Sequence, residues 1–289
     1  MPSDEIAAIL QDLEAYDGIY PWEAVNAAMA QREEIIPRLI DSLEKIAAEP
    51  TFALEDEDYF LHNYAVMLLG HFREPRAHRA IVDVFGLPDD RALQLFGDLI
   101  TEHLSTVLFN TCGGNYDLIK KLIVNRRSDE FARGEAARAM VYGVATGQLP
   151  REEVLDFFST LFTGDEAEKL SAFWGLVAEG ILDLHPRELM PLIQEADERG
   201  LLNGSYLVEE DFVNVLPTSV EDCLNEVRQE IEGRSLDDLH GVISAWPCFS
   251  EPGWEPDASL PEIPKAKNKK PQKKRKKKMA KASRRKNRR

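Results

Sequence analysis

The sequence has few cysteines, and they are too widely separated to act together. Cys112, Cys223 and Cys248 make neither a Cys-x-x-Cys pair nor an even set of partners. This argues against a disulfide-stabilised secreted domain and against a cysteine-based metal site. The chain also lacks an apolar run near the ~18 residues of a membrane span. Its acidic start lacks the basic and then apolar pattern of a secretory signal, so we expect a cytoplasmic protein.

Motifs of known catalytic chemistry are missing as well. The sequence has no Walker A pattern, no Gly-x-Ser-x-Gly and no His-Glu-x-x-His among its six histidines. Cys112 stands before two glycines, but a reactive thiolate needs a neighbouring base or cation, and only the distant His103 suggests one. Buried packing is the better interpretation of this cysteine. The sequence therefore predicts a protein that is not an enzyme and holds no cofactor or metal.

Patterns typical of β-strands are rare, because almost no stretch alternates apolar and polar residues. Apolar residues instead recur with helical spacing, as at Val154, Phe157, Phe158 and Leu161. Prolines fall where helices would begin, at a place where the missing N–H would be unpaired anyway. These prolines are Pro21, Pro75, Pro150 and Pro186. The pattern predicts an all-α fold.

A repeat of about 36 residues organises the helical pattern. Pro150-Arg151-Glu152 recurs as Pro186-Arg187-Glu188, and Ala136 and Ala172 share the same offset. Further helices are expected at 22–30, 34–47, 64–69, 75–82, 99–109 and 116–124. A single helix pair cannot bury its apolar stripe, whereas stacked pairs share one core. We expect a HEAT-like α-solenoid of about four to six helix pairs over residues 1–245, with a non-repeating bundle as the alternative.

The composition changes after residue 245. Residues 246–264 contain five prolines and few apolar residues, which is typical of an extended linker. Trp246 and Phe249 are expected to fold back against the last helix pair, as is Trp254. Residues 265–289, here named the basic tail, contain nothing to bury, so we expect them to be disordered.

Charge separates the two parts of the chain. The basic tail holds 16 of the 35 lysines and arginines and no acidic residue, which leaves 19 basic against 51 acidic residues in the body. The body charge is therefore near −32 and the tail charge near +16, although the net charge is −16. A lysine-rich segment binds phosphates without reading sequence, so RNA, the ribosome or DNA would serve equally. A tail that only neutralises its own body is the alternative.

The candidate nucleic-acid contacts are the densest basic positions of the tail. They are Lys269, Lys270, Lys273, Lys274, Arg275, Lys276, Lys277, Lys278, Arg284 and Arg285. Because the tail has no aromatic residue, we expect no base stacking and no sequence readout.

A second candidate is a polar cluster of Arg73, Arg76, Asp98 and Glu102. Asp98 and Glu102 are four positions apart and face the same way on a helix, where like charges repel. The two arginines at the turn of the preceding repeat could relieve that repulsion, which favours a salt bridge between repeats. A metal-dependent or hydrolytic enzyme centred on Asp98, Glu102 and His103 is the alternative.

The body resembles the bacterial family known as domain of unknown function 1186. The stretches that carry the resemblance are Tyr16–Pro21, Phe72–Ala77, Gly97-Asp98 with Thr101-Glu102, Cys112–Gly114 and Leu149–Val154. The resemblance implies a cytosolic helical-repeat protein with no assigned activity. Some relatives end in a cysteine-rich, zinc-binding SEC-C segment, and the basic tail without cysteine stands in its place here. We therefore expect a non-catalytic adaptor that binds a protein partner on its solenoid face.

Overall fold

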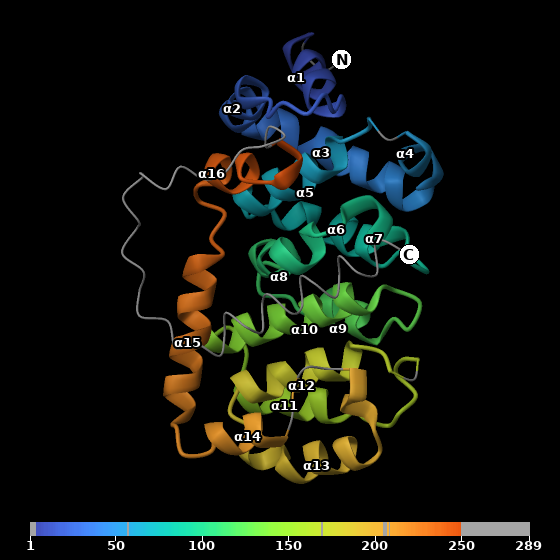
Figure 1. The fold of residues 1–289 in the computed structure, drawn as a ribbon. Coiled ribbons are helices and arrows are strands. Elements are labelled where there is room, and N and C mark those ends of the chain that lie inside the picture. Colours follow the sequence, from blue (N-terminus) through green and yellow to red (C-terminus); the bar gives the residue numbers. More distant parts are fainter. Residues whose placement is uncertain (1–3, 57, 169, 205–206, 208, 250–289) are drawn as a thin grey trace.

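The computed structural model describes residues 4–56, 58–168, 170–204, 207 and 209–249, and every regular element among them is a helix (Figure 1). Ala15 and Tyr59 form an isolated antiparallel β-bridge between two connecting segments. The all-α prediction is confirmed. None of the described helices is both long enough and apolar enough to cross a membrane.

Two rows of helices form the body. The first row contains α5 (Leu61–Phe72), α8 (Leu99–Thr111), α10 (Glu130–Ala145) and α12 (Phe173–Asp183), and each helix packs on the next. The second row contains α3 (Arg32–Ala48), α6 (His78–Phe85), α9 (Asp117–Val124) and α11 (Arg151–Ser159). Helices of the second row pack against the first, as α3 does on α5 and α9 on α10.

Other helices complete the ends of the body. The N-terminal end carries α1 (Asp4–Glu14), α2 (Trp22–Ala30) and α4 (Thr51–Glu55), and α7 (Arg91–Phe96) lies beside the rows between α4 and α8. The opposite end carries α13 (Met190–Glu198) and α14 (Glu209–Val215). After α14, α15 (Val220–Gly233) leads back along the body to α16 (Leu239–Ser244). Four short 3-10 helices, η1 (Pro75–Ala77), η2 (Arg187–Leu189), η3 (Leu201–Gly204) and η4 (Pro247–Phe249), join these elements.

Helix beginnings follow the local chemistry that the sequence indicates. Pro21 and Pro150 directly precede α2 and α11, and Pro75 begins η1. At α10 the Asp129 side chain accepts hydrogen bonds from two backbone N–H groups of the first turn, which would otherwise lack partners. Ser219 and Asp222 form a reciprocal capping box at the start of α15.

A recurring arginine contact ties the rows together. Arg32 and Arg151 each begin a second-row helix and donate to a carbonyl at the end of a first-row helix, Phe72 at 2.9 Å and Leu184 at 2.6 Å. Arg187, at the start of η2, makes a similar contact with the Leu216 carbonyl after α14, at 3.4 Å. The first helices of the pairs do not keep the 36-residue offset, since Ala136 lies inside α10 whereas Ala172 precedes α12. The HEAT-like solenoid stays a prediction.

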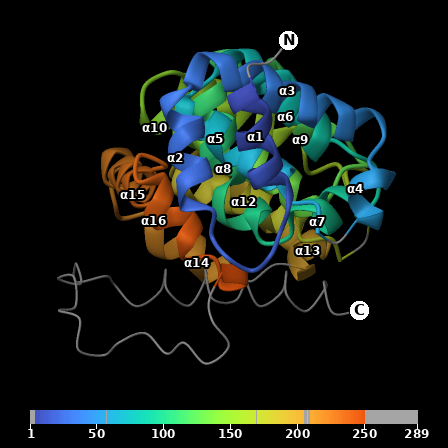
Figure 2. The same cartoon turned by 90° about the horizontal axis from the view of Figure 1, so that it is seen from above.

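The chain then reverses along the stack. Successive helices descend from α1 to α13, and α15 runs back beside the first row to bring α16 next to α5 and α2 (Figures 1 and 2). Figure 2 views the stack from its N-terminal end and shows α15 and α16 together on one flank. The first and last described segments therefore lie at the same end of the body.

This return places the last described residues differently from the prediction. Trp246 and Phe249 do not pack on the last helix pair but contact Phe60 edge to face, at ring-centroid distances of 6.3 and 5.9 Å. Aromatic surface at the N-terminal end, including Tyr16 at 6.0 Å from Phe249, offers them a larger apolar contact. Trp254, residues 250–264 of the predicted linker and the basic tail lie outside the described residues.

Candidate functional site

The predicted polar cluster is divided between several partners. Arg73, in a left-handed conformation at the end of α5, forms a salt bridge of 3.0 Å with Asp237 just before α16. Arg76 binds Glu74 at 2.7 Å and lies 3.5 Å from Glu33. Burial opposes the charge of Glu74, but the hydrogen bond from Arg76 outweighs it and lowers the pKa of that carboxyl group. Both arginines thus form ion pairs with carboxylates other than the two that the sequence suggested.

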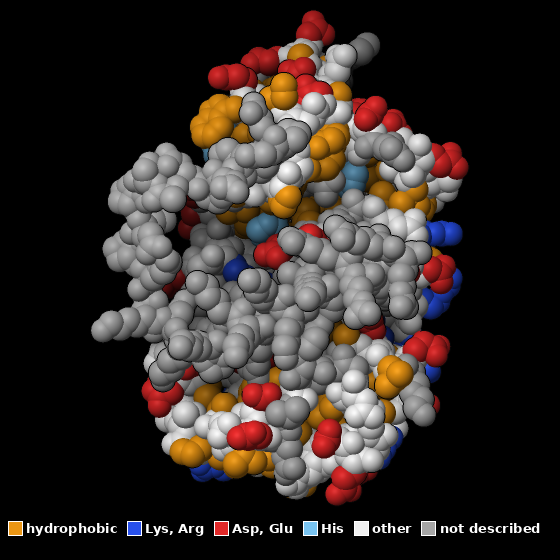
Figure 3. Space-filling model, in the orientation of Figure 1, with side chains coloured by type: hydrophobic (Ala, Val, Ile, Leu, Met, Phe, Trp, Pro, Cys, Tyr) orange, Lys and Arg blue, Asp and Glu red, His pale blue; other side chains and the backbone are white. Residues whose placement is uncertain are grey.

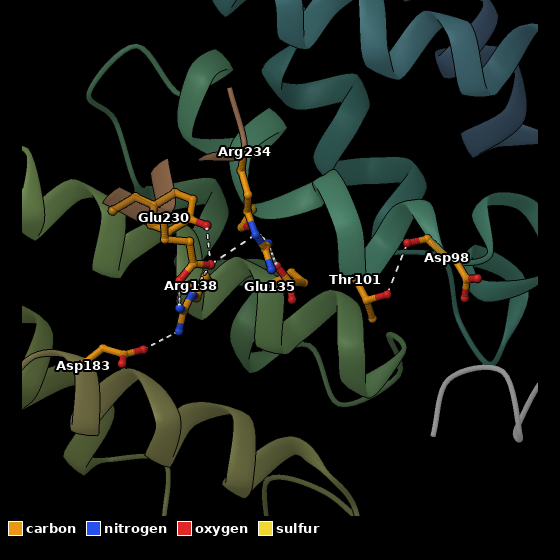
Figure 4. Close-up of polar contacts among 9 residues, drawn as sticks. Asp98, Thr101, Glu135, Arg138, Asp183, Glu230 and Arg234 are labelled. Carbon is orange, nitrogen blue, oxygen red and sulfur yellow. Dashed lines mark hydrogen bonds and ion pairs between the residues drawn. The ribbon is translucent and has the colours of Figure 1, made fainter. Parts of the chain in front are cut away.

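Asp98 and Glu102 take positions at the start of α8. Asp98 is the N-cap residue, and its backbone carbonyl accepts from the Thr101 hydroxyl at 3.2 Å and from the Glu102 amide at 3.0 Å. The Glu102 side chain is exposed. Figure 4 shows Asp98 and Thr101 apart from the buried arginines of the neighbouring helices.

His103 is engaged with the returning C-terminal segment. Its Nε2 atom accepts from the Trp246 indole N–H at 3.4 Å, and the two rings lie 6.1 Å apart. Burial, together with the positive charge of Arg234, lowers the pKa of His103 to about 4. This histidine is therefore neutral near pH 7. Across the part of the chain that the structure describes, no three His, Cys, Asp or Glu side chains gather in a way that could hold a metal ion.

Cys112 has the environment of a packed residue. It is buried at the end of α8, and its thiol points to the Phe109 carbonyl at 3.3 Å. Burial is the largest influence on this thiol and raises its pKa above the ordinary value. A thiol held in its neutral form is a poor nucleophile, which agrees with the sequence interpretation.

Sequence reasoning missed a buried charge cluster under α15. We use this name for Glu135 and Arg138 of α10, Asp183 at the end of α12, and Glu230 with Arg234 at the end of α15. Figure 4 shows Arg138 between Asp183 and Glu230, with Arg234 beside Glu135. The side chains of Glu135 and Glu230 are only 6% exposed.

The contacts of this cluster satisfy most of its polar atoms. Arg138 donates to Asp183 and, through its other terminal nitrogen, to Glu230. Glu230 also accepts from the Tyr142 hydroxyl at 3.0 Å and lies 3.1 Å from Arg234. Arg234 reaches Glu135 at 3.4 Å and donates to the Ser105 hydroxyl of α8 at 3.0 Å. Four helices are therefore joined by one network.

Electrostatics keeps the arginines of the cluster charged. Burial opposes the charge of Arg138, but Glu230 and Asp183 outweigh it and raise its pKa well above the ordinary value. Burial acts in the opposite sense on Glu135, where it raises the pKa, and the nearby Arg234 limits that rise. Burial also raises the pKa of Tyr142 to about 12, so its hydroxyl remains a donor to Glu230. The arginines and carboxylates of the cluster therefore stabilise one another, as in a structural ion-pair network.

A local signal for this cluster exists in the sequence but points to the surface. Glu135 and Arg138 are three positions apart, and Glu230 and Arg234 are four apart. Such pairs are common on solvated helix faces, where each contributes about 0.2–0.5 kcal/mol. Nothing in the spacing indicates that the two pairs, 92 positions apart at Arg138 and Glu230, meet inside the protein.

An aromatic cluster forms where the two ends of the described chain meet. His240 of α16 stacks on Trp22 at 3.9 Å and binds the Tyr20 hydroxyl through Nδ1 at 2.7 Å. Its Nε2 atom lies 3.0 Å from the Asn26 side-chain oxygen. Trp22 remains 49% exposed and the neighbouring Ile19 72% exposed. The contact fixes α16 to α2 while leaving apolar surface at this end.

Comparisons with known proteins support a relationship over the helical body. An uncharacterised protein of Chlamydia trachomatis is 32% identical over 249 residues, which cover 85% of this chain and 99% of that protein. An uncharacterised protein of Chlamydia muridarum is 32% identical over 243 residues, covering 84% of this chain and 96% of the relative. No solved structure matches this chain.

The match to a family model has the same extent. The family described as "Protein of unknown function (DUF1186)" matches residues 4–250, from the first described helix to the end of the described body. The match stops before Lys265, where the basic tail begins. The helical body thus carries what the family shares, and the chain belongs to the DUF1186 family.

Proposed function

We propose that this protein is a non-catalytic helical adaptor, whose body binds a protein partner and whose basic tail contacts RNA, the ribosome or DNA without sequence preference. The observation that carries the proposal is the division of charge between a body near −32 and a tail of 16 basic and no acidic residues. Because the family match ends at residue 250, the helical body and the basic tail are separate modules in this proposal.

The chemistry of the tail supports contact with a polyanion. Lysine and arginine side chains that neutralise phosphates release condensed counterions, which makes binding strongly dependent on salt. If about 8 phosphates were contacted, the logarithm of the binding constant would fall against the logarithm of salt concentration with a slope of about −6 to −7. The acidic body opposes this contact, since it repels a polyanion.

Features of the body support the adaptor half of the proposal. The packed row of α5, α8, α10 and α12 gives the body an elongated scaffold, as in a helical-repeat protein. Buried charged groups such as Arg138 and Glu230 bind one another, so their ion pairs hold the helices of the body together. Acidic side chains are spread over both ends of the face in Figure 3, which favours a partner with a basic surface. The predicted HEAT-like solenoid and cytoplasmic location belong to the same proposal.

The test compares full-length protein with a chain ending at Pro264. Binding of labelled single-stranded RNA and duplex DNA is measured at about 50 mM and about 200 mM salt, where loss of a multi-phosphate contact is large. We expect tail-dependent binding to both nucleic acids that weakens steeply with salt. A matched variant with arginine at Lys273, Lys274, Lys276, Lys277 and Lys278 keeps the charge and should bind as the wild type does. Glutamine at the same five positions should bind more weakly than the wild type, because it removes part of the tail's charge. Equal binding by the full-length and truncated chains would reject the tail half of the proposal.

A further inference from the structure

α15 is attached to the body through a narrow apolar stripe and a set of charged side chains. Cys223 and Val227 of this helix are buried, and Leu224 and Ile231 are partly buried against the core. By contrast, nearly every residue of α10, which lies directly beneath it, is buried. The contact between α15 and the body thus combines apolar packing with charged hydrogen bonds, as an interface between separable parts does.

The two helices meet along complementary stripes. On α10, Glu135, Arg138, Tyr142 and Ala145 recur at the spacing of one helix face. Arg228 of α15 donates to the Ala145 carbonyl at 2.7 Å, Glu230 meets Arg138 and Tyr142, and Arg234 meets Glu135. As the chain advances from Arg228 to Arg234, its partners on α10 recede from Ala145 to Glu135, so the two helices run in opposite directions.

This contact is selective. A buried ion pair gives little net stability compared with apolar packing, because removing two charges from water offsets their attraction. An unmatched charge in the same place is strongly unfavourable, so Arg138 and Glu135 accept a helix only if it presents the opposite charges in the right register. Glu135 and Arg138 of α10 thus select a helix by the position of its charges as well as by its fit.

The segment that follows α15 has its own contacts with the body, so α15 can detach while this segment stays in place. Beyond Arg234, the Leu236 carbonyl binds His71 at 2.7 Å, and Asp237 binds Arg73 at 3.0 Å. The Cδ1 atom of Leu236 would lie only 3.0 Å from a methyl group built on Gly70, so this segment is closely packed on α5. The segment around Leu236 is held independently of the charge cluster.

We propose that the α10–α12 flank is the partner-binding face of this protein and that α15 is its internal competitor. The partner is an amphipathic helix of a second protein that carries a glutamate followed four positions later by an arginine, as Glu230 and Arg234 do in α15. The glutamate binds Arg138 and the arginine binds Glu135. This inference rests on the proposed adaptor function and specifies the chemistry of its protein partner.

Hydrogen exchange of the purified full-length protein tests whether α15 can leave. Amides of Val220–Gly233 should exchange at least about tenfold faster than those of Glu130–Ala145, as expected for local opening of a separable helix. Glu230→Gln should raise exchange in α15, whereas Glu232→Gln, at an exposed position of the same helix, should not. Exchange of both helices at one common rate would show that α15 is a permanent part of the core and would overturn the proposal.

A peptide tests whether the face recognises the pattern. A fluorescent peptide with the sequence of residues 219–235 is titrated with full-length Glu230→Gln/Arg234→Gln, whose α10 face is intact and whose own α15 is weakened. We expect affinity about tenfold or more above that for the wild type, because charged hydrogen bonds are returned to Arg138 and Glu135. The same peptide carrying Glu230→Arg and Arg234→Glu should not bind.

Each result of the peptide experiment decides the proposal. Equal affinity for both peptides, or no binding of either to the weakened variant with an unchanged circular dichroism spectrum, would overturn it. A dimer of the weakened variant in light scattering would make a second copy the occupant and would also overturn the assignment. Because no nucleic acid and no tail variant is involved, loss of tail binding in the adaptor test would leave these results unaffected.

Discussion

The Tyr16 hydroxyl donates a hydrogen bond of 2.7 Å to the backbone carbonyl of Cys248, a residue 232 positions later in the chain. This contact joins the loop after the first helix to the last 3-10 helix and closes the path of the chain around its own flank. Residues 246–249, predicted from the sequence as the start of a linker, therefore help to hold the segment that follows α15 on the body.

Phe249 is expected to contribute to the stability of the N-terminal end. Its ring lies 5.6 Å from Tyr20 and 5.9 Å from Phe60. Phe249→Ala should lower the free energy of unfolding by about 2 kcal/mol, less than a fully buried phenylalanine because the ring is partly exposed. Phe249→Leu should recover most of this loss. Urea denaturation checks both, and an unchanged midpoint for Phe249→Ala would contradict the packing.

The helices were predictable to the extent that local signals decide them. Residues 22–30 were expected as a helix, and α2 spans Trp22–Ala30. Pro150 marks the start of α11 in the same way, because its missing N–H is tolerated where a helix begins and disfavoured inside one. For such elements the sequence pattern contains the physical cause of the structure.

The return of the chain and the buried charge cluster were not predictable in this way. Periodicity shows which side of a helix is apolar, but it does not say which later helix covers it. Arg138 and Glu230 look like surface residues when each helix is read alone, and only the fold places them together. Trp246 and Phe249 were expected to fold back on the body, but nothing in the sequence indicates that they meet Phe60 near its N-terminal end.

Arg138 and Glu230 are expected to be strongly coupled. Arg138→Leu or Glu230→Leu alone leaves the other buried charge with one ionic partner fewer, although Asp183 remains for Arg138 and Arg234 for Glu230. Either variant should lower the free energy of unfolding by up to about 3–5 kcal/mol. The double variant should be destabilised by clearly less than the sum of the single effects, because it buries no orphaned partner in this pair. Urea unfolding of all four proteins measures the coupling.

The exposed pair Arg79 and Asp83, at 3.6 Å, is the matched control for this cycle. Its side chains are 77% and 49% exposed, so solvent screens the attraction and a coupling below about 0.5 kcal/mol is expected. Similar coupling energies for the two pairs would mean that the buried position of Arg138 and Glu230 has no energetic consequence.

Three histidines should make the protein less stable in mild acid. Burial lowers the pKa of His62, His78 and His103 from 6.5 to about 4, and Arg234 adds to the effect at His103. Above pH 6.5 each is neutral in both states. As pH falls below 6.5, the unfolded chain takes up protons that the folded protein does not, so stability is lost down to about pH 4. At pH 5 the loss is about 2 kcal/mol per histidine.

The measurement is the free energy of unfolding between pH 7.5 and 5. This window lies above the pKa range of most carboxyl groups, and Glu188, whose pKa the hydrogen bond from Arg151 lowers to about 2, acts only at lower pH. His78→Gln should reduce the slope in this window, whatever packing change it causes at pH 7.5. An identical slope in the variant would show that His78 is not kept neutral by the fold.

Gly143 marks a close approach of another side chain to α10. A methyl group added there would lie 2.5 Å from the Tyr116 hydroxyl oxygen, and both positions are buried. Gly143→Ala should therefore lower the free energy of unfolding by about 1–3 kcal/mol, even though alanine favours a helix by up to ~1 kcal/mol over glycine. Gly233→Ala provides the comparison, since its new methyl group meets nothing within 4 Å and only the helix preference remains. Denaturation of both variants should give opposite signs or a clear loss for Gly143 alone, and an equal effect at the two glycines would refute the close contact with Tyr116.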